Sequence, residues 1–500
     1  MIKKILIANR GEIAVRIIRA CRELGIKSAA IYSDADKTSL HTRLADESYY
    51  IGESASSQSY LNNEKIVALA EKINADAVHP GYGFFSENFS FIKTLEEKKV
   101  IFIGPSSASV AMMGSKTAAR NLMKKHGVPI VPGTTEAINN LQEGIEAAVS
   151  IGFPVLLKAS AGGGGKGMRK ISSKAEFEDA FEATQREAMK AFGSDEIYIE
   201  KYIENPRHIE VQVIGDKMGN YAHLFERECS VQRRHQKIIE ESPSSFVDEQ
   251  TRKKITGAAV DAAKACGYYN AGTVEFLMDA NKNFYFLEMN TRLQVEHPVT
   301  EMISGIDLVK EQISIADGNE LSFKQSNLKI NGHAIECRIY AEDPEENFLP
   351  ATGKIYEYKI PSGPGVRVDD GFGVGSEISV YYDPLIAKLV CWAGDRLNAV
   401  ERMKRALNEY EIAGVVNNIS FLKTIMNNKE FRSGNININF IEHEFENLIS
   451  EMKNDTTSAN LDDVAAIFTV LLKTSSLIKK NGVSYFDDDR KNLWGSLIHE

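Results

Sequence analysis

The sequence predicts an α/β protein with an N-terminal doubly wound parallel sheet, followed by units that are richer in antiparallel strands. Near the N-terminus, short apolar runs at 5–8, 28–32 and 100–103 alternate with stretches of helical periodicity, the pattern of a parallel sheet. Further along, four consecutive glycines lie between two short strand patterns. From about residue 330, apolar and polar residues alternate between Gly-Pro turns. With 500 residues, the chain is long enough for several domains.

The composition excludes several broad classes of protein. Hydrophobic residues at 43% and charged residues at 26% are ordinary for a soluble globular protein. A net charge of −10 argues against a general nucleic-acid binder. No apolar run has the length of a membrane helix, and residues 1–4 lead into a strand without a signal peptide's apolar stretch. The five cysteines include no C-x-x-C pair, so we expect reduced thiols and a cytoplasmic location.

The helical pattern at 116–126 ends at Gly127, and Pro129 and Pro132 follow it. Glycine and proline in this order end a helix and predict a hinge. The segment from about His208 to Asn290 is then rich in strand patterns. We therefore expect a mobile unit between the hinge and this strand-rich part of the chain.

A glycine-rich hairpin follows the hinge, where residues 158–169 read KASAGGGGKGMR. Because glycine lacks a Cβ atom, the backbone can approach a polyphosphate closely and direct its N–H groups at the anion. Lys158 and Lys166 add positive charge to the hairpin. It does not match the dinucleotide fingerprint, since a strand pattern at 168–171 follows instead of a helix, or the P-loop, since Gly167 follows the lysine. This segment alone leaves a mobile surface hairpin as an alternative.

Two apolar runs on either side of a short polar segment predict an antiparallel hairpin. In a register that pairs Leu277 with Phe286, Glu275 lies opposite Glu288, and Asn290 shares the face of Glu288. Two carboxylates and an amide oxygen on a buried face need a cation between them, and such ligands suit Mg²⁺ carried by nucleotide phosphates. The alternative is a hairpin whose glutamates face solvent. The glycine-rich hairpin upstream favours the metal.

The residues that follow this hairpin suggest an anion site. Arg292, Gln294 and Glu296 occupy alternate positions, so in an extended chain they point the same way. Arginine can hold a small carboxylate-like anion through two parallel hydrogen bonds, and a neighbouring glutamate can take its proton. Lys237 could supply a second positive contact. A plain salt-bridged loop explains this segment equally well.

The later part of the chain is less distinctive. Residues 333–340 alternate apolar and polar side chains, which predicts a half-exposed strand and by itself gives Arg338 no special role. Residues 455–460 have the composition of a linker, and 461–477 have the pattern of an amphipathic helix.

Taken together, these motifs make the chain similar to biotin carboxylase, the ATP-grasp component of biotin-dependent carboxylases. The resemblance extends from residue 1 to about 445 and rests on segments such as HPGYGF at 79–84, ECSVQRRHQK at 228–237, EMNTRLQVEHP at 288–298 and YDPLIAK at 382–388. It implies an ATP-grasp fold with an N-terminal doubly wound parallel-sheet domain and a C-terminal α+β domain. The implied division is 1–114 (N-terminal domain), 115–330 (ATP-grasp domain with a mobile lid at about 132–203), 331–446 (C-terminal domain) and 447–500 (helical extension).

The resemblance also implies a role for individual residues. The nucleotide would be held by Lys116, Lys158, Gly164, Gly165, Glu200, Lys201, Ile203, His208, Gln232, His235 and Leu277, and Mg²⁺ or Mn²⁺ by Glu275, Glu288 and Asn290. Bicarbonate would be bound by Lys237, Arg292, Gln294, Val295 and Glu296, with Glu296 as general base. Arg338 would stabilise the biotin enolate and Tyr82 would lie near the biotin ring. Arg292, Glu296, Arg338 and Lys237 are thus the expected catalytic residues.

The implied reaction begins with transfer of the γ-phosphoryl group of ATP to bicarbonate. A closing lid would protect the resulting carboxyphosphate from water, and its CO₂ would carboxylate biotin. Biotin would arrive on a separate biotin carboxyl carrier protein, and carboxyltransferase subunits would pass the carboxyl group on. We expect a homodimer and an acetyl-CoA carboxylase of fatty acid biosynthesis, although the site residues do not separate acetyl-CoA from propionyl-CoA or pyruvate as acceptor.

Two other kinds of protein share part of these motifs. A different ATP-grasp ligase, joining a carboxylate to an amine, would have the lid and the metal hairpin but would not need the bicarbonate pocket or Arg338. A non-catalytic nucleotide-binding regulator would be expected to lack a metal carboxylate or the glutamate base, yet Glu275, Glu288 and Glu296 are all present.

Two further signals carry no function in this interpretation. Residues 188–190 read Ala-Met-Lys, like a biotin attachment site, but they lie in a helical pattern. We therefore expect Lys190 to remain unmodified. Cys229 adjoins an arginine-rich segment, but the chemistry above needs no thiol, so we expect a bystander cysteine.

Overall fold

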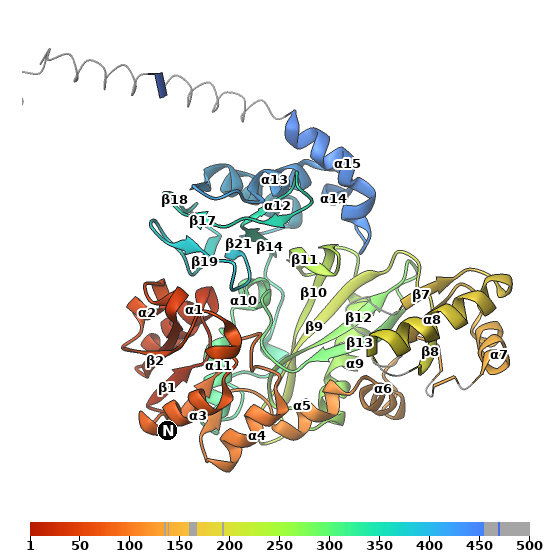
Figure 1. Ribbon diagram of the computed structural model, residues 1–500, viewed down its shortest axis with the longest axis horizontal. Helices are drawn as coiled ribbons and strands as arrows, with labels where there is room; N and C mark the ends of the chain where they lie inside the picture. Colours follow the sequence, from red (N-terminus) through yellow and green to blue (C-terminus); the bar gives the residue numbers. More distant parts are fainter. Residues whose placement is uncertain (135–136, 139, 160–167, 193–194, 455–468, 471–500) are drawn as a thin grey trace, which may run out of the picture. The chain divides into compact units, whose positions relative to one another are not determined.

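The computed structural model describes residues 1–500 except 135–136, 139, 160–167, 193–194, 455–468 and 471–500 (Figure 1). Residues 1–446 form one compact unit and residues 447–500 a second. Of the second unit, the structure describes residues 469–470 and residues 447–454, which include the end of α15 (Phe440–Lys453). The helix expected at 461–477 thus lies almost wholly outside the described residues.

The N-terminal part forms the predicted parallel sheet. Its strands have the order β3–β2–β1–β4–β5, and each pair is parallel. Side chains of β1 are buried on both faces, with Ile5 and Ile7 in one apolar cluster and Leu6 in another, so the sheet is doubly wound. Its elements are β1 (Lys4–Ile7), α1 (Gly11–Glu23), β2 (Lys27–Ser33), α2 (Leu40–Leu44), β3 (Glu47–Gly52), α3 (Asn63–Lys72), β4 (Ala77–His79), α4 (Phe89–Glu97), β5 (Ile101–Phe102) and α5 (Ser107–Gly114).

An eight-stranded antiparallel sheet (Figure 1) carries the three predicted metal-binding residues together with Lys237 and Arg338. Its order is β13–β12–β9–β10–β11–β14–β21–β19. Helix α9 (Glu249–Ala265) packs on β9 and β10. The strands are β9 (Arg207–Gly215), β10 (Tyr221–Arg233), β11 (Gln236–Ser242), β12 (Asn270–Met278), β13 (Phe284–Asn290), β14 (His333–Tyr340), β19 (Val366–Asp370) and β21 (Leu385–Ala393).

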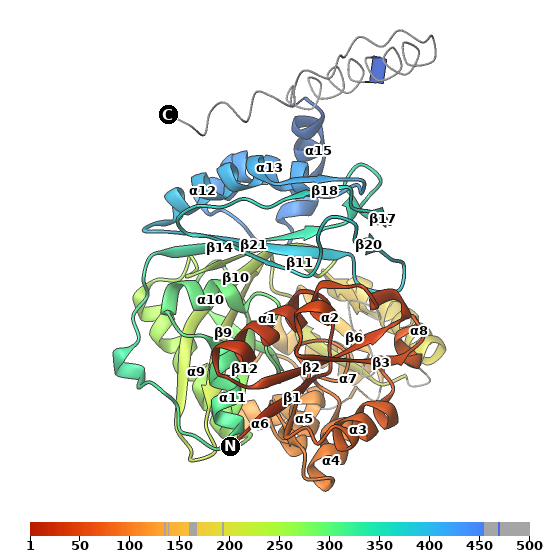
Figure 2. The same ribbon diagram turned by 90° about the vertical axis from the view of Figure 1, so that its left-hand side faces the viewer.

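The prediction that residues 333–340 form a half-exposed strand is wrong in one respect. They do form a strand, β14, but all of its side chains are buried. Strands β11 and β21 flank it, and helices α10 (His297–Ser304), α12 (Arg396–Glu409) and α13 (Ile419–Asn427) pack on it (Figure 2). The polar residues of β14 therefore lie in the interior, where each needs a partner.

A smaller sheet holds the predicted glycine-rich hairpin. Strands β6 (Val155–Ala159) and β7 (Met168–Ile171) pair antiparallel, and β8 (Ile197–Lys201) pairs with the other edge of β6. Helices α7 (Leu141–Ile151) and α8 (Phe177–Phe192) pack on these strands. The hairpin tip, which contains Gly164 and Gly165, lies outside the described residues. Lys190 lies in α8, in agreement with the helical pattern that we predicted for it.

The predicted hinge connects these two sheets. Helix α6 (Lys116–Lys125) ends as expected, and Phe286 N then donates to Pro129 O (2.7 Å), which ties the segment to β13. Gly133 next forms a bridge with Glu200 of β8. A Cβ atom at Gly133 would lie 2.4 Å from the carbonyl oxygen of Ile199, so the close approach requires glycine.

The other elements cover and extend these sheets. They are α11 (Leu308–Ala316), β15 (Glu342–Asp343), β16 (Leu349–Pro350), β17 (Gly353–Lys354), β18 (Glu357–Lys359), β20 (Glu377–Ile378), β22 (Glu411–Ala413), α14 (Lys429–Ser433) and the short 3₁₀ turns at 34–36, 56–58, 174–176 and 325–327. No helix in the described part of the chain is long and apolar enough to cross a membrane.

Candidate active site

A largely buried lysine at the start of β11 brings three carboxylates together. Lys237 Nζ donates to Glu210 Oε2 (2.6 Å), Glu275 Oε1 (3.0 Å) and Glu296 Oε1 (2.7 Å). These glutamates belong to β9, to β12 and to the turn before α10. The fold therefore joins the predicted metal hairpin to the predicted anion site through Lys237.

Electrostatics keeps these four groups charged. Burial would lower the pKa of Lys237, but the three carboxylates outweigh it and hold that pKa well above its ordinary value. Burial would likewise raise the pKa values of Glu210 and Glu275, but the neighbouring cations together outweigh it and hold both pKa values well below the ordinary value. These cations are Lys237 and Arg227 for Glu210, and Lys237 and His208 for Glu275. At neutral pH the cluster is an ionised network with more carboxylates than ammonium groups.

The predicted carboxylate pair lies on neighbouring strands. Glu275 of β12 is directly opposite Glu288 of β13, as predicted. The predicted pairing of Leu277 with Phe286 is wrong, because a bulge between Glu275 and Phe276 shifts the register and places Leu277 opposite Tyr285. An extra residue of this kind cannot be deduced from alternation.

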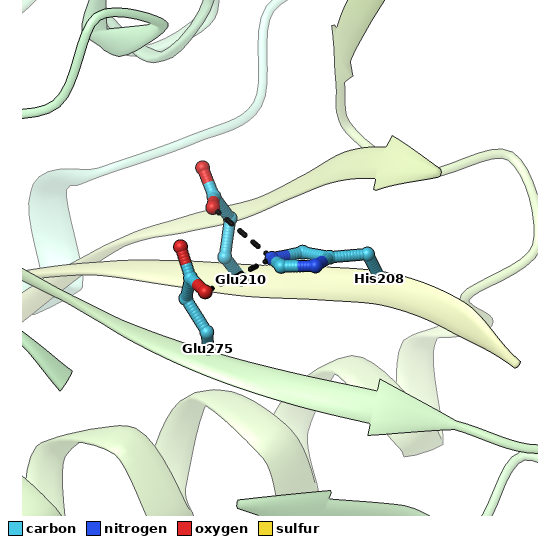
Figure 3. Close-up of side chains that lie close together, drawn as sticks. All are labelled: His208, Glu210 and Glu275. Atoms are coloured by element: carbon cyan, nitrogen blue, oxygen red, sulfur yellow. Dashed lines mark ion pairs between the residues drawn. The ribbon is translucent and has the colours of Figure 1, made fainter. Parts of the chain in front are cut away.

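His208 and Glu210 add to this face of the sheet. Figure 3 shows the His208 ring directed at both carboxylates, with Nε2 3.3 Å from Glu275 Oε2 and 3.6 Å from Glu210 Oε2. Burial would lower the pKa of His208, but the carboxylates of Glu275 and Glu210 together outweigh it and raise that pKa to about 9. Cations thus surround Glu275.

The residues expected to bind a metal fit a hard divalent cation. Glu275 and Glu288 offer carboxylate oxygens from adjacent strands, and Asn290 shares the face of Glu288, which is the ligand chemistry that Mg²⁺ favours. Asn290 Nδ2 donates to Glu275 Oε1 (2.8 Å), and its Oδ1 accepts from Arg292 Nη2 (2.8 Å). Asn290 therefore connects the carboxylate pair to the expected anion site.

Arg292 and Gln294 both reach this network. Arg292 Nε donates to Glu87 Oε2 (2.8 Å), a carboxylate that we did not predict. Gln294 Nε2 donates to Glu275 Oε1 (2.8 Å), and Gln294 Oε1 accepts from Arg227 Nη2 (2.6 Å). Gln294 is thus held by charged partners on two strands, β12 and β10, and Arg292 by the carboxylate of Glu87.

The extended geometry predicted for residues 292–296 ends before Glu296. Glu296 is the N-cap of α10 with φ −82° and ψ 11°, so the chain turns at this residue. Its carboxylate nevertheless meets the predicted cations, with Oε1 on Lys237 and Oε2 3.0 Å from Arg338 Nη2. Burial would raise the pKa of Glu296, but Lys237, Arg338 and Arg227 together outweigh it and lower that pKa.

Arg338 lies inside the protein between two carboxylates. Its Nε donates to Glu240 Oε1 (2.6 Å), and its Nη2 contacts both Glu240 and Glu296. Burial raises the pKa of Glu240 to about 7, although Arg338 acts in the opposite direction. A buried arginine with two glutamates is a fixed donor, which is what stabilisation of a negative charge requires.

The expected nucleotide residues lie around β8, β9, β12 and the β10–β11 turn. Glu200 of β8 forms ion pairs with Lys158 and Arg120, and Lys201 Nζ donates to the carbonyl groups of Gly152 (2.9 Å) and Phe153 (3.0 Å). Lys116 is at the start of α6, and Ile203 follows β8. Leu277 of β12 pairs with His208 of β9. Gln232 of β10 pairs with Lys237 of β11, and His235 lies in the turn between those two strands.

Tyr82, expected near biotin, lies next to the N-terminal helix. Its hydroxyl donates to Glu12 of α1, and its ring centroid is 5.8 Å from Lys388 Nζ. Burial raises the pKa of Tyr82 well above its ordinary value, so the hydroxyl stays protonated.

Several charged residues of the site were missed from the sequence. Arg227 is fully buried and donates to Glu210 Oε1 (2.6 Å), Gln212 Oε1 (2.8 Å) and Thr300 Oγ1 (2.9 Å). Glu210, Glu240 and Glu87 were missed as well. For Arg227, Glu210 and Glu240, which lie in strands, a charged residue among apolar ones is the signal that could have indicated them, since such residues are seldom buried unpaired. Glu87 lies in a turn before α4, where this signal does not apply.

Comparisons with known proteins agree with this geometry. Family models match residues 1–110 ("Biotin carboxylase, N-terminal domain"), 115–324 ("Carbamoyl-phosphate synthase L chain, ATP binding domain") and 336–443 ("Biotin carboxylase C-terminal domain"). Biotin carboxylase 1 of Bacillus subtilis is 53% identical over 443 residues, 88% of this chain and 98% of that protein. The biotin carboxylase of a Nostoc species is 52% identical over 439 residues, 88% of this chain and 98% of that protein.

Solved structures give the same result. A Campylobacter jejuni biotin carboxylase in complex with β-γ-ATP is 49% identical with a TM-score of 0.84, over 89% of this chain and 99% of that one. The biotin carboxylase domain dimer of Hydrogenobacter thermophilus 2-oxoglutarate carboxylase, in complex with MgADP, ADP and bicarbonate, is 49% identical with a TM-score of 0.83, over 90% of this chain and 99% of that one.

The two sheets and the carboxylate pair are those of an ATP-grasp enzyme. Since the matched models and relatives cover most of its length, the chain belongs to the biotin carboxylase family.

Proposed function

We propose that this chain catalyses the ATP-dependent carboxylation of biotin by bicarbonate, the first half-reaction of a biotin-dependent carboxylase. The observation that carries this proposal is the position of Glu296. Its carboxylate lies between Lys237 (2.7 Å) and Arg338 (3.0 Å), and Lys237 also contacts Glu275 of the carboxylate pair. A base, two cations and a metal-binding pair thus form one continuous site.

In the first step, bicarbonate binds where Lys237 and Arg292 supply positive charge, and Glu296 takes its proton. The bicarbonate oxygen then attacks the γ-phosphorus of ATP, and ADP leaves as the bond to the β-phosphate oxygen breaks. Glu275, Glu288 and Asn290 hold the divalent ion, Mg²⁺ or Mn²⁺, which when bound neutralises phosphate charge. Lys116, Lys158 and His208 contact the nucleotide phosphates or ribose, and Gly164 and Gly165 close over the phosphates. Gln232 and His235 lie near the ribose. The adenine slot is lined by Glu200, Lys201, Ile203 and Leu277.

In the second step, carboxyphosphate breaks into CO₂ and phosphate, and the phosphate takes the N1 proton of biotin. The resulting ureido enolate is stabilised by Arg338, and its N1 attacks CO₂ to give carboxybiotin. Arg338 is already fixed by Glu240 and Glu296, so little reorganisation is needed when the negative charge develops. Tyr82 lies near the biotin ring, and Gln294 and Val295 complete the bicarbonate pocket.

The partners and the division into domains are further parts of the proposal. We propose that biotin arrives on a carrier protein, that carboxyltransferase subunits receive the carboxyl group, and that the chain forms a homodimer. We retain domains at 1–114, 115–330 and 331–446, and a helical extension at 447–500. A cytoplasmic location is supported by the cysteines, all five of which are buried and unpaired.

The acceptor stays a prediction. Relatives are named for pyruvate, propionyl-CoA, methylcrotonoyl-CoA and 2-oxoglutarate carboxylases, so a biotin carboxylase site of this kind serves several acceptors. Acetyl-CoA, with a role in fatty acid biosynthesis, is the acceptor that the sequence led us to expect.

Steady-state ADP release with free biotin, ATP, Mg²⁺ and bicarbonate tests the proposal. We expect release to depend on both bicarbonate and biotin, and Glu296→Ala and Arg338→Ala to lower kcat by about 10² to 10⁴. Arg405→Ala, which removes an exposed ion pair with Glu409, serves as the charge-matched control. ADP release that needs an amine instead of biotin would indicate a different ATP-grasp ligase.

A further inference from the structure

Lys388 is a fully buried lysine to which the proposed mechanism gives no task. It lies in β21, and its side chain has no exposed surface. Its Nζ donates to the carbonyl oxygen of Val295 (2.8 Å) and forms an ion pair with Glu12 Oε1 (3.1 Å). A buried ammonium group is costly unless it is paired and hydrogen-bonded, so these two contacts explain how the protein tolerates it.

The bond to Val295 acts directly on the proposed bicarbonate site. Val295 precedes Glu296, the N-cap of α10, so its carbonyl group lies outside the helix's own hydrogen-bond ladder. The carbonyl of Val295 and the amide of Glu296 belong to one rigid peptide plane. By holding the Val295 carbonyl, Lys388 fixes the peptide plane that precedes the Cα atom of Glu296. It thereby fixes the turn that places the Glu296 carboxylate between Lys237 and Arg338.

Nearby charges leave Lys388 available for this contact. Asp369 lies opposite Lys388 across β19 and β21, but both of its oxygens accept from Arg367 (2.9 and 2.7 Å). Both oxygens of Glu336 lack a hydrogen-bond partner among the described residues, and burial raises its pKa well above the ordinary value. Glu12 is thus the carboxylate that balances Lys388.

We propose that Lys388 is a positioning residue for the bicarbonate site, holding the Val295–Glu296 turn, with Glu12 as its counter-charge. The inference rests on the proposed function. It differs from a purely structural role because it predicts a selective effect. A displaced turn acts directly on the use of bicarbonate through Glu296, whereas it reaches the residues on β9 and β12 only indirectly, through the contacts of Lys237 with Glu210 and Glu275.

Steady-state kinetics of Lys388→Met tests the inference. We expect kcat/KM for bicarbonate to fall by roughly 10²-fold, the effect of a misplacement of about 1 Å, with little change in KM for MgATP. Arg252→Met is the matched control, since Arg252 also joins a buried carboxylate, Glu226 (2.8 Å), to a backbone carbonyl, that of Val247 (3.1 Å), but away from the turn. It should leave kcat/KM for bicarbonate close to that of the wild type.

A double variant, Glu12→Gln with Lys388→Met, separates positioning from charge balance. It removes the Glu12 carboxylate that Lys388→Met alone would leave without its counter-charge, so it keeps the comparison possible if Lys388→Met alone fails to fold. We expect its bicarbonate defect to persist, because nothing holds the Val295 carbonyl. Recovery of wild-type kinetics in the double variant, or an equal loss for bicarbonate and MgATP, would overturn the inference. A wild-type protein without bicarbonate-dependent ADP release would instead refute the proposed function itself, and the inference with it.

Discussion

At the residue scale, the central feature is one ammonium group shared by three carboxylates. Lys237 contacts Glu210, Glu275 and Glu296 within 3.0 Å, and all three are buried. Removing one partner of a buried ion pair is costly because the other charge is left uncompensated. The lysine therefore contributes to stability as well as to the proposed chemistry.

Lys237→Met should accordingly destabilise the protein by about 3–5 kcal/mol. Urea unfolding at neutral pH measures this difference. The matched control is Lys359→Met, which breaks an exposed pair with Glu411 and should have almost no effect, because exposed ion pairs contribute little. Equal stability of Lys237→Met and the wild type would contradict the ionised network.

The predictability of the site also depends on single residues. Glu275 and Glu288 could be predicted because strand alternation places them opposite each other in the hairpin. Glu296 could be predicted from its motif, although the extended geometry expected for it was wrong. Glu210 and Arg227 could not, because alternation assigns charged residues to a solvent face, whereas β9 and β10 are covered on both sides. Such interior charges become visible only when the sheet order is known.

At the element scale, the approach of the hinge segment to β8 depends on one glycine. A Cβ atom at Gly133 would overlap the carbonyl oxygen of Ile199 at 2.4 Å. Gly133→Ala should push the segment away, destabilise the protein by about 1–3 kcal/mol and weaken nucleotide binding by Glu200 on the same strand. Thermal unfolding and an ADP titration measure the two effects, and unchanged values would contradict the bridge between Gly133 and Glu200.

Gly257 gives the opposite expectation for the same substitution. It lies within α9, and a Cβ atom there would meet nothing within 4 Å. Because alanine favours the helix, Gly257→Ala should raise the free energy of unfolding by about 1 kcal/mol. Urea unfolding of Gly257→Ala and of Gly133→Ala compares the two free energies of unfolding. A loss of stability would show that the position is more crowded than the structure indicates.

Helices and strands were predictable where one hydrophobic period, that of a helix or that of a strand, dominated the sequence. The parallel strands, helix α6 and the β6–β7 hairpin follow from apolar runs and their turn residues. The bulge at Glu275 and the turn at Glu296 do not, because each depends on long-range contacts: β12 is held by both β9 and β13, and Glu296 by Lys237 and Arg338.

At the scale of the whole molecule, buried neutral histidines make stability depend on pH. Burial lowers the pKa of His41 to about 4 and, with Arg16 adding to the effect, that of His79 to about 3. In the unfolded chain a histidine titrates near 6.5. Between these values the unfolded state binds protons that the folded state does not, so the stability present above pH 6.5 is lost as the pH falls.

His79→Gln should therefore flatten this dependence. By pH 5 the wild type should have lost about 2 kcal/mol through His79 alone, and the variant should not show that loss. Urea unfolding from pH 7 to pH 5 measures the slope, with the exposed His126→Gln as control. An unchanged slope in His79→Gln would mean that His79 is protonated in the folded protein.

The central claim is that one site activates bicarbonate and carboxylates biotin. The most direct measurement incubates the protein with ¹⁴C-bicarbonate, MgATP and free biotin and follows radioactivity in acid-labile carboxybiotin alongside ADP. The account predicts label in biotin in an amount equal to the ADP released by the biotin-dependent reaction, and labelling that is slower by about 10² to 10⁴ with Arg338→Ala. Biotin-dependent ADP release that leaves biotin unlabelled would contradict it.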